Sequence, residues 1–459
     1  MYPQKEPIAL VNCCLPPPSG KLIGPPQSTL YLASALDQQG WVSTIYDTSI
    51  NIIPAEFTPE KLYQFLLEIP ERIIGISLWD SVSPKVILAT QKLKEKNPEK
   101  IIILGGPTAS ALGEKLIAYF PWINYIVFGE GEEVLQKLLS WIVSNNRSAN
   151  TLPSRVVGRN KGGIFYGKAD ISLLKPTQIP LPDYSLINNN NIKYNRAEII
   201  TTRGCPFNCS YCSVNNALGN SIRYRNGRHF FEEINNHIYQ RGFDFIHILD
   251  DNFGLSKKRF LQFINKFSAR YPNIAWSCYH RIIDMDISTI DLMVKSGCRG
   301  VYTGIEPDDG MKSNNGSKIF NKDAILERIR YASKFMNITG SIIWGFPNEN
   351  LTQFKEKLEL IDEILNFENV FVNIYQLAPL SGTRILNDLK NRLIFDEERI
   401  SGFIYPPYLS PLTADEKILI KENPVMFSAF YHEDTREFDN KFKAVNKFIG
   451  NDKQYIKKF

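Results

Sequence analysis

Three cysteines on one short loop constrain this chain more than any other feature of its sequence. Cys205, Cys209 and Cys212 stand in the stretch RGCPFNCSYCS with a C-x3-C-x2-C spacing. Three thiolates can bind three irons of a cubane [4Fe–4S] cluster and leave the fourth iron open to another ligand. A three-cysteine structural zinc site and a chance spacing are the alternative interpretations. A zinc site usually has a fourth Cys or His nearby, and no fourth one lies between Gly204 and Arg228.

The aromatic residue before the third cysteine adds a resemblance to a known family. With Tyr211 in that position, the spacing is similar to the cluster motif of the radical S-adenosylmethionine (SAM) superfamily. The resemblance implies that the open iron binds SAM and donates the electron that cleaves a C–S bond of SAM. It also implies that the three cysteines are the catalytic metal ligands. Tyr211 would form an aromatic wall beside the last of them.

The first 146 residues alternate apolar runs of strand length with helical patterns. This alternation of strands and helices predicts an α/β domain with a doubly wound, Rossmann or flavodoxin-like sheet, because each crossover is right-handed and leaves a helix on one face. Ligands of such sheets bind beyond the C-terminal ends of the strands. The predicted strands are Ile8–Cys13, Trp41–Tyr46, Ile73–Leu78, Ile101–Leu104 and Ile123–Phe128.

The loops after these strands carry a second resemblance. In chain order they read NCCLPPPSGKLIGPPQSTLYLASAL, GISLWDS, ILGGPTAS and VFGEGEE, and they resemble the N-terminal cobalamin-binding domain of one branch of the radical SAM enzymes. The resemblance implies that Gly105 and Gly106 let the nucleotide tail of cobalamin approach the backbone. Ser77 would face the same crevice. An ordinary flavodoxin-like or nucleotide-binding sheet is the alternative.

Many cobalamin proteins bind cobalt from below with a histidine, and this part of the sequence lacks one. The first histidine of the chain is His229. We therefore expect cobalt without a histidine ligand from this domain. The protein then lacks an axial histidine through which it could tune the reactivity of the metal. Trp79, at the tip of the third predicted strand, is the candidate for the lower face of cobalamin. A half-buried aromatic residue at the rim is the alternative.

The rest of the chain is predicted in three parts. Residues 147–196 form a connector, because a Ser, Asn and Thr cluster is followed by extended, proline-punctuated sequence. Residues 197–384 alternate strands and helices again and resemble the partial (β/α)6 barrel of radical SAM enzymes. Residues 385–459 are expected to form a small, mostly helical cap over the barrel mouth, near the substrate. The predicted barrel strands are Glu198–Thr202, Phe243–Leu249, Ala275–Tyr279, Gly300–Ile305, Thr339–Trp344 and Val370–Leu377.

Polar residues at the ends of the barrel strands are the predicted SAM contacts. The resemblance implies that Asp250 and Asp251 face the ammonium group of SAM, a charge-assisted pairing. Arg281 would bind the carboxylate of SAM, and Glu306 would reach its ribose or amine. The alternatives are a helix-capping role for Asp250 and an ion pair between Arg281 and Asp284.

The composition argues against several other classes of protein. The net charge of +5 is small for 459 residues and the basic residues are scattered, so nucleic-acid binding is not expected. No apolar run is long enough to span a bilayer, and the N-terminus lacks the form of a secretory signal. Seven cysteines, three of them assigned to iron, favour a reducing compartment, and we expect a cytoplasmic protein.

Together the two resemblances imply a cobalamin-dependent radical SAM enzyme, most often a methyltransferase. In the family's usual scheme, one SAM methylates cob(I)alamin and a second SAM yields a 5′-deoxyadenosyl radical. That radical removes a hydrogen from an unactivated carbon of a small-molecule or peptide substrate, which then takes the methyl group from methylcobalamin. We expect a monomer that receives electrons from a donor of the flavodoxin or ferredoxin type.

Three alternatives stay open at this point. Some relatives use the same cofactors for cyclisation or rearrangement without methyl transfer. A tRNA methylthiotransferase would need a second cysteine-ligated cluster near the N-terminus, where the chain offers only the adjacent Cys13 and Cys14. A non-catalytic iron–sulfur protein would leave Asp250, Arg281 and Glu306 without an explanation.

Overall fold

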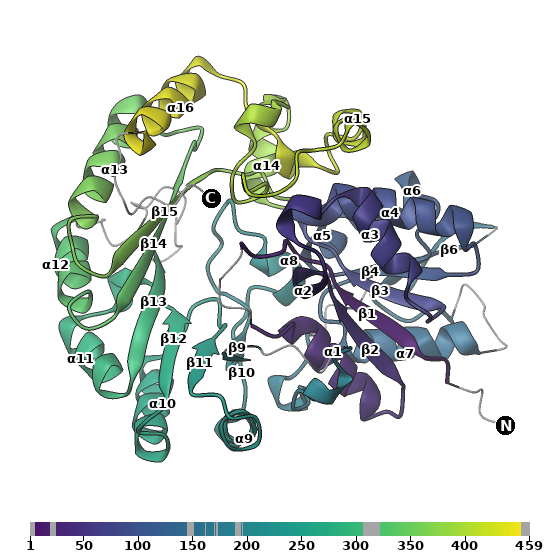
Figure 1. Ribbon diagram of the computed structural model, residues 1–459, viewed down its shortest axis with the longest axis horizontal. Helices are drawn as coiled ribbons and strands as arrows, with labels where there is room; N and C mark the ends of the chain where they lie inside the picture. The colour runs from purple at the N-terminus through teal and green to yellow at the C-terminus, as the bar shows by residue number, and fades with distance from the viewer. Residues whose placement is uncertain are drawn as a thin grey trace.

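Two α/β domains lie side by side, and the C-terminal part of the chain extends over both of them (Figure 1). The computed structural model describes residues 5–18, 24–144, 151–160, 162–168, 170, 173–188, 194, 196–305 and 322–450. Within these residues, no helix combines the length and the apolar character needed to cross a lipid bilayer.

The N-terminal sheet follows the predicted doubly wound pattern. Its strand order is β2-β1-β3-β4-β5-β6-β7, with β1 to β5 parallel and β6 and β7 antiparallel. The first five strands have the flavodoxin-like order, which places the topological switch point between β1 and β3. The strands are β1 Ile8–Asn12, β2 Ser43–Asp47, β3 Ile73–Ser77, β4 Ile101–Gly105, β5 Tyr125–Val127, β6 Val156–Asn160 and β7 Gly163–Tyr166.

Both faces of this sheet are covered by helices, which explains why its strands read as continuous apolar runs. Side chains alternate between the two faces of a strand. In β1, Ile8 and Leu10 join the core under α1 and α7, whereas Ala9 and Val11 join the core under α3 and α4. The covering helices are α1 Gln27–Asp37, α3 Pro59–Leu67, α4 Ser83–Lys96 and α7 Glu132–Val143.

Two details of the N-terminal half differ from the prediction. Part of the predicted connector forms β6 and β7, an antiparallel pair that extends the sheet beyond β5. Between β4 and β5 the alternating pattern predicts one helix, and the structure has two short ones, α5 Pro107–Leu112 and α6 Glu114–Tyr119. They meet at Gly113, whose φ of 48° is left-handed and ends the first helix.

The second domain is the predicted six-stranded parallel sheet, and all six predicted strands are confirmed. The strand order is β15-β14-β13-β12-β11-β8, so β8 and β15 are the two edges. Helices α10 to α13 cover its outer face (Figure 1). The strands are β8 Ala197–Ile199, β11 Phe245–Ile248, β12 Ala275–Tyr279, β13 Cys298–Gly304, β14 Asn337–Trp344 and β15 Val370–Gln376. The helices are α9 Gly227–Asn235, α10 Lys257–Arg270, α11 Ile287–Lys295, α12 Lys322–Ala332 and α13 Leu351–Ile364.

A small substructure connects β8 to α9. It consists of the antiparallel pair β9 Thr202–Arg203 and β10 Arg223–Tyr224, with the short helix α8 Val214–Leu218 between them. In Figure 1 this pair lies between the barrel and the N-terminal domain. The three-cysteine motif is therefore placed on the side of the barrel that faces the N-terminal sheet.

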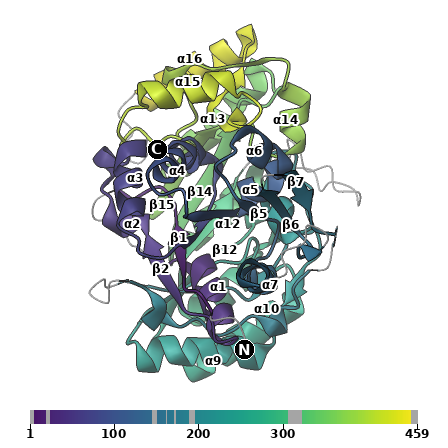
Figure 2. The same ribbon diagram turned by 90° about the vertical axis from the view of Figure 1, so that its right-hand side faces the viewer.

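The C-terminal region packs against both domains, and its expected role as a cap over the barrel mouth stays a prediction. Part of the region lies at the C-terminal end of β15, where Gln376 Nε2 donates to the Arg399 carbonyl oxygen at 2.8 Å. Helix α15 Ala414–Glu422 packs on the core under α3 and α4 (Figure 2). Helix α16 Arg436–Ile449 packs on the barrel, where the Phe438 and Trp344 rings stack at 5.4 Å.

Candidate active site

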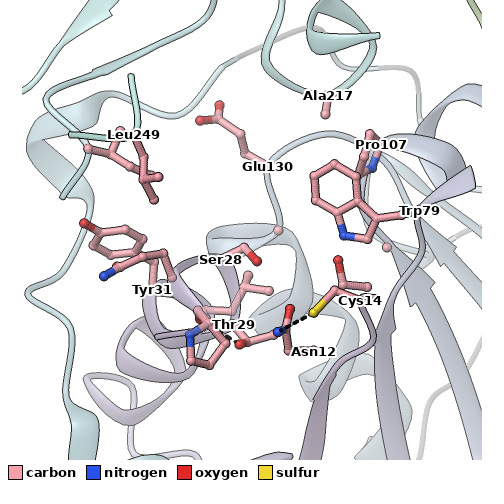
Figure 3. Close-up of a pocket in the computed structure, with 18 of the residues that line it drawn as sticks. Asn12, Cys14, Ser28, Thr29, Tyr31, Trp79, Pro107, Glu130, Ala217 and Leu249 are labelled. Carbon is pink, nitrogen blue, oxygen red and sulfur yellow. Dashed lines mark hydrogen bonds between the residues drawn. The ribbon is translucent and has the colours of Figure 1, made fainter. Parts of the chain in front are cut away.

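A cavity of about 720 Å³ lies between the C-terminal edge of the N-terminal sheet and the barrel. Strands β1, β3 and β4 contribute Asn12, Ser77 and Gly105 to its wall, and the barrel contributes Leu249 and Asp251. Figure 3 shows side chains of both domains around it. The cavity opens at the switch point between β1 and β3, where a doubly wound sheet binds its ligands.

The two glycines after β4 present bare backbone to this cavity. Gly106 has a φ of 92°, and a Cβ atom on it would lie 3.1 Å from both the Leu78 carbonyl oxygen and Ser77 Oγ. A side chain at this position would therefore be strained and crowded. Gly105, Gly106 and Ser77 all line the cavity, in the crevice where they are predicted to lie. Their contact with a nucleotide tail stays a prediction.

Trp79 lies on the same wall, with 45% of its surface exposed. Figure 3 places its indole beside Pro107 and near Cys14, whose sulfur accepts a hydrogen bond from Asn12 Nδ2 at 3.4 Å. None of the five histidines of the chain, all of which the structure describes, lines the cavity. An indole, an amide and bare glycine backbone fit a cobalamin that is held without histidine on the metal.

The cysteine loop begins with a glycine that the fold requires. Gly204 has a φ of 85°, and a Cβ atom on it would lie 2.4 Å from the Ser221 carbonyl oxygen. Cys205, Cys209 and Cys212 follow and are all partly buried. The cavity reaches the end of this loop, because Ser213 and Val214 line it.

The segment after β15 supports the cysteine loop from outside. The Ile385 N–H donates to the Ser210 carbonyl oxygen at 2.9 Å, and Arg384 Nη2 donates to the Asn208 carbonyl oxygen at 3.0 Å. Asn216, in α8, donates to the Ser381 carbonyl oxygen at 2.9 Å. The end of the turn after β15 and the start of α14 Arg384–Leu389 thus support the loop through these bonds.

The donor set of the loop fits a cluster better than a single metal ion. Burial raises the pKa of the Cys205 and Cys212 thiols, although the backbone N–H groups of Phe207 and Val214 offset part of this rise. Iron must therefore displace protons when it binds. In the described part of the chain, no three His, Cys, Asp or Glu side chains converge as one metal ion requires. A cubane cluster instead carries its three thiolates on separate irons.

Tyr211 and Arg281 both lie against the surroundings of the cysteine loop. The Tyr211 ring packs on Phe346 with the ring centroids 5.5 Å apart, next to the turn that follows β14. The Arg281 guanidinium lies 4.4 Å from the centroid of Phe207, a residue of the loop itself. Arg281 Nη1 also lies 3.8 Å from Asp284 Oδ2, so the ion pair considered as an alternative is present. Its binding to SAM stays a prediction.

The two adjacent aspartates after β11 have different surroundings. Asp250 is fully buried and accepts hydrogen bonds from the backbone N–H groups of Thr201 and Thr202 at 2.6 and 3.0 Å. Asp251 lines the cavity with its surface exposed there, and partial loss of surrounding water together with the neighbouring Asp250 raises its pKa to about 6. Asp250 therefore orders the strand end before the cysteine loop, and Asp251 is left as the carboxylate that can meet a ligand. Glu306, the remaining predicted SAM contact, lies outside the described residues.

Ion pairs between the domains were not predicted. Glu130 Oε1 accepts from Arg203 Nη1 at 2.9 Å, and Glu130 Oε2 accepts from Arg223 Nη1 at 2.6 Å. Glu132 Oε1 adds a second partner for Arg203 at 2.7 Å. Burial alone would lower the pKa of the Arg203 guanidinium, but the two carboxylates outweigh it and raise this pKa. The GEGEE and RGC segments were both noted in the sequence, yet no sequence pattern shows that they meet.

A second contact joins the loop after β3 to the end of the barrel. Ser381 Oγ donates to Asp80 Oδ1 at 2.5 Å, in a place where Asp80 is only 8% exposed. Burial raises the pKa of Asp80 to about 6, although the hydrogen bond from Ser381 lowers it in part. The domains that enclose the cavity are therefore joined by two separate sets of polar contacts.

Comparison with protein families agrees with this division of the chain. Residues 19–139 match the B12 binding domain model, and residues 199–361 match the radical SAM superfamily model. The two matches lie on the N-terminal sheet and on the barrel, one on each side of the cavity.

Several known proteins are similar over most of the chain. An uncharacterized methyltransferase of Pyrococcus horikoshii, PH0819, is 24% identical over 87% of this chain and 90% of its own length. The anaerobic magnesium-protoporphyrin IX monomethyl ester cyclase of Cereibacter sphaeroides is 24% identical over 83% of this chain and 63% of its own length.

Among solved structures, the radical S-adenosylmethionine methyltransferase TsrM of Kitasatospora setae has the same fold. Its form with tryptophan substrate and a SAM analog gives a TM-score of 0.72 at 17% identity, over 97% of this chain and 88% of that chain. Another form of TsrM was solved with cobalamin and a [4Fe–4S] cluster bound.

Proposed function

This chain belongs to the cobalamin-dependent radical SAM enzymes, and we propose that it transfers a methyl group from methylcobalamin to an unactivated carbon of its substrate. The substrate would be a small molecule or a peptide natural product. The observation that supports the proposal most is the single cavity that the glycine loop of the N-terminal sheet and the start of α8 both line. Cobalamin, cluster and substrate need such a common space for the reacting atoms to meet.

We assign the cofactors to residues as follows. Cys205, Cys209 and Cys212 would hold the cluster, and the backbone at Gly105 and Gly106 would receive cobalamin. When bound, the cluster and SAM supply a radical and cobalamin supplies the methyl group. Asp251, at the cavity, would hold the ammonium group of SAM, and Arg281, stacked on the cysteine loop, would hold its carboxylate.

The protein itself would contribute orientation and the exclusion of water. The buried Glu130–Arg203 and Asp80–Ser381 contacts hold the two domains together. Asp250 fixes Thr201 and Thr202 and so fixes the strand end from which the cysteine loop departs. Fixed walls of this kind keep the reacting groups in line and limit side reactions of a radical with solvent.

The decisive experiment follows a labelled methyl group. The anaerobically reconstituted protein, loaded with cobalamin and reduced, is incubated with deuterated-methyl SAM and an extract of small molecules and peptides. We expect a product that carries the label, together with 5′-deoxyadenosine and S-adenosylhomocysteine. The Cys205→Ala, Cys209→Ala, Cys212→Ala triple variant should give neither labelled product nor 5′-deoxyadenosine.

A cyclase is the second candidate, because the chain is also similar to the anaerobic magnesium-protoporphyrin IX monomethyl ester cyclase. A cyclase would form 5′-deoxyadenosine and consume its substrate, but neither labelled product nor S-adenosylhomocysteine would appear. That result would replace methyl transfer with cyclisation and leave the cofactor assignments in place.

A further inference from the structure

The carboxylate of Glu130 connects the N-terminal domain to both ends of the cysteine loop. Glu130 lies between β5 and α7, lines the cavity (Figure 3), and has only 1% of its side chain exposed. Its two oxygens accept from Arg203 at 2.9 Å and from Arg223 at 2.6 Å. Arg203 stands directly before Gly204, and Arg223 follows α8. All three cysteines lie on the segment between these two arginines.

The two arginines need a carboxylate between them. Arg203 and Arg223 are directly opposite each other in the β9–β10 pair, with side chains 7% and 13% exposed. Like charges in this position repel each other, and the repulsion is stronger where water is excluded. Glu130 bonds to both guanidinium groups, whereas Glu132 bonds to Arg203 alone. Glu130 is therefore the one described carboxylate that holds the pair together.

Arg223, which Glu130 binds, also binds the C-terminal end of the loop. Its Nη2 donates to the carbonyl oxygen of Leu218, the last residue of α8, at 2.8 Å. Its Nη1 donates to the Leu174 carbonyl oxygen at 2.6 Å, and the Leu174 N–H donates to Glu130 Oε2 at 2.9 Å. Helix α8 begins two residues after Cys212, so one carboxylate fixes the start and the end of the cluster-binding segment.

We propose that Glu130 is a positioning residue for SAM cleavage, through which the cobalamin-binding domain sets the geometry of the cysteine loop. Glu130 acts through Arg203 and Arg223 and does not itself bind iron. Because Glu130 also lines the cavity, a ligand that fills the cavity holds this carboxylate against the two arginines. The inference concerns SAM cleavage and does not depend on whether the final reaction is methyl transfer or cyclisation.

The first test uses the full-length protein without metal or cobalamin. Hydrogen–deuterium exchange is compared between wild type, Glu130→Gln and the matched control Glu133→Gln. Glu133 lies in the first turn of α7, and its carboxylate pairs only with the exposed Lys137 among the described residues. We expect exchange in residues 204–222 to become about tenfold faster in Glu130→Gln. The control should exchange like the wild type.

The second test uses the reconstituted holoenzyme. Glu130→Gln should retain its iron but form 5′-deoxyadenosine about tenfold more slowly at saturating SAM, because a displaced cluster loop misaligns the reacting atoms. The change that SAM causes in the electron paramagnetic resonance spectrum of the reduced cluster should also be weaker. The KM for SAM should change less than kcat, and Glu133→Gln should match the wild type in each measurement.

Wild-type exchange in residues 204–222 together with wild-type cleavage in Glu130→Gln would overturn the proposal. Faster exchange over the whole chain would overturn it too, because Glu130 would then serve general stability. If Glu130→Gln does not fold, Arg223→Met replaces it and removes the more exposed arginine of the pair. That variant should show faster exchange in residues 213–222 and slower cleavage, and wild-type behaviour in both would contradict the proposal.

Discussion

Lys85 Nζ lies 2.5 Å from Glu416 Oε1, and each of the two side chains is only 1% exposed. Lys85 belongs to α4 of the N-terminal domain, and Glu416 lies in the first turn of α15. Glu416 also accepts from the Thr413 N–H at 2.9 Å as part of a capping box. The same carboxylate thus caps α15 and holds that helix on the N-terminal domain.

Replacing one partner of this pair should destabilise the protein strongly. Lys85→Met leaves the buried Glu416 carboxylate without its counterion, a change that typically costs about 3–5 kcal/mol. Denaturant unfolding should show this loss. Lys92→Met is the control, because Lys92 pairs with Glu60 between α4 and α3 at the surface, and should cost less than about 1 kcal/mol. Equal losses in the two variants would contradict the role assigned to Lys85.

The cysteine loop should account for the iron of the protein. After anaerobic reconstitution, the wild type should bind about four irons, and the triple Ala variant of Cys205, Cys209 and Cys212 should lose the iron, the brown colour and SAM cleavage. Cys298→Ala is the control, because Cys298 is fully buried in the barrel core away from the loop. Full iron retention in the triple variant would rule out the cluster assignment.

SAM and cobalamin binding should be separable by mutation. Arg281→Ala should weaken SAM binding by about 2–4 kcal/mol, because the carboxylate of SAM loses its partner. Gly106→Val should instead weaken cobalamin binding, since a side chain there would crowd Leu78 and Ser77. Separate titrations of SAM and of cobalamin into each variant measure which of the two affinities is lost. An equal loss of SAM affinity and cobalamin affinity in both variants would contradict the assignment of SAM to the barrel and cobalamin to the N-terminal sheet.

Cobalt should carry no imidazole from this protein. None of the five histidines, each of which belongs to the described part of the chain, lines the cavity, and Trp79 is the predicted neighbour of the lower face. The electron paramagnetic resonance spectrum of the Co(II) form should therefore lack the nitrogen splitting that a lower imidazole causes. The spectrum of Trp79→Phe should also lack it. Nitrogen splitting in the wild type, or a failure to bind cobalamin, would contradict this prediction.

Asp80 should make the stability of the interface depend on pH. Its pKa in the folded protein is about 6, above the ordinary value of 3.8. The folded state thus binds this proton more tightly than the unfolded state, and the contribution of Asp80 to stability falls as the pH rises from about 4 to about 6. The full effect is about 3 kcal/mol, with 1.36 kcal/mol for each pKa unit.

The Asp80→Asn variant isolates this contribution. Its side-chain oxygen can still accept from Ser381, but it has no charge to bury. Unfolding free energies at pH 4.5 and pH 7 should therefore differ between wild type and Asp80→Asn, with the variant gaining relative stability at pH 7. A difference between the two proteins that does not change with pH would mean that Asp80 stays ionised in the folded state.

Local patterns in the sequence were sufficient for the parallel strands, the cysteine loop and the glycine turn. Apolar runs predicted the parallel strands of both sheets because covered parallel strands bury both faces, whereas the antiparallel β6 and β7 were not predicted. Cys205, Cys209 and Cys212 are close in sequence, so their shared loop follows from spacing alone. Gly105 and Gly106 were placed at the cavity because ligands bind at the C-terminal ends of parallel strands.

Only the tertiary structure decided which distant charges meet. Glu130 and Arg203 are 73 residues apart, and Lys85 and Glu416 are 331 residues apart. Nothing in the sequence around these four residues distinguishes them from other charged residues. Likewise, Asp250 and Asp251 are identical neighbours, but the fold buries one under Thr201 and Thr202 and turns the other to the cavity. A charge acquires its role from burial and partners, which depend on how the domains pack.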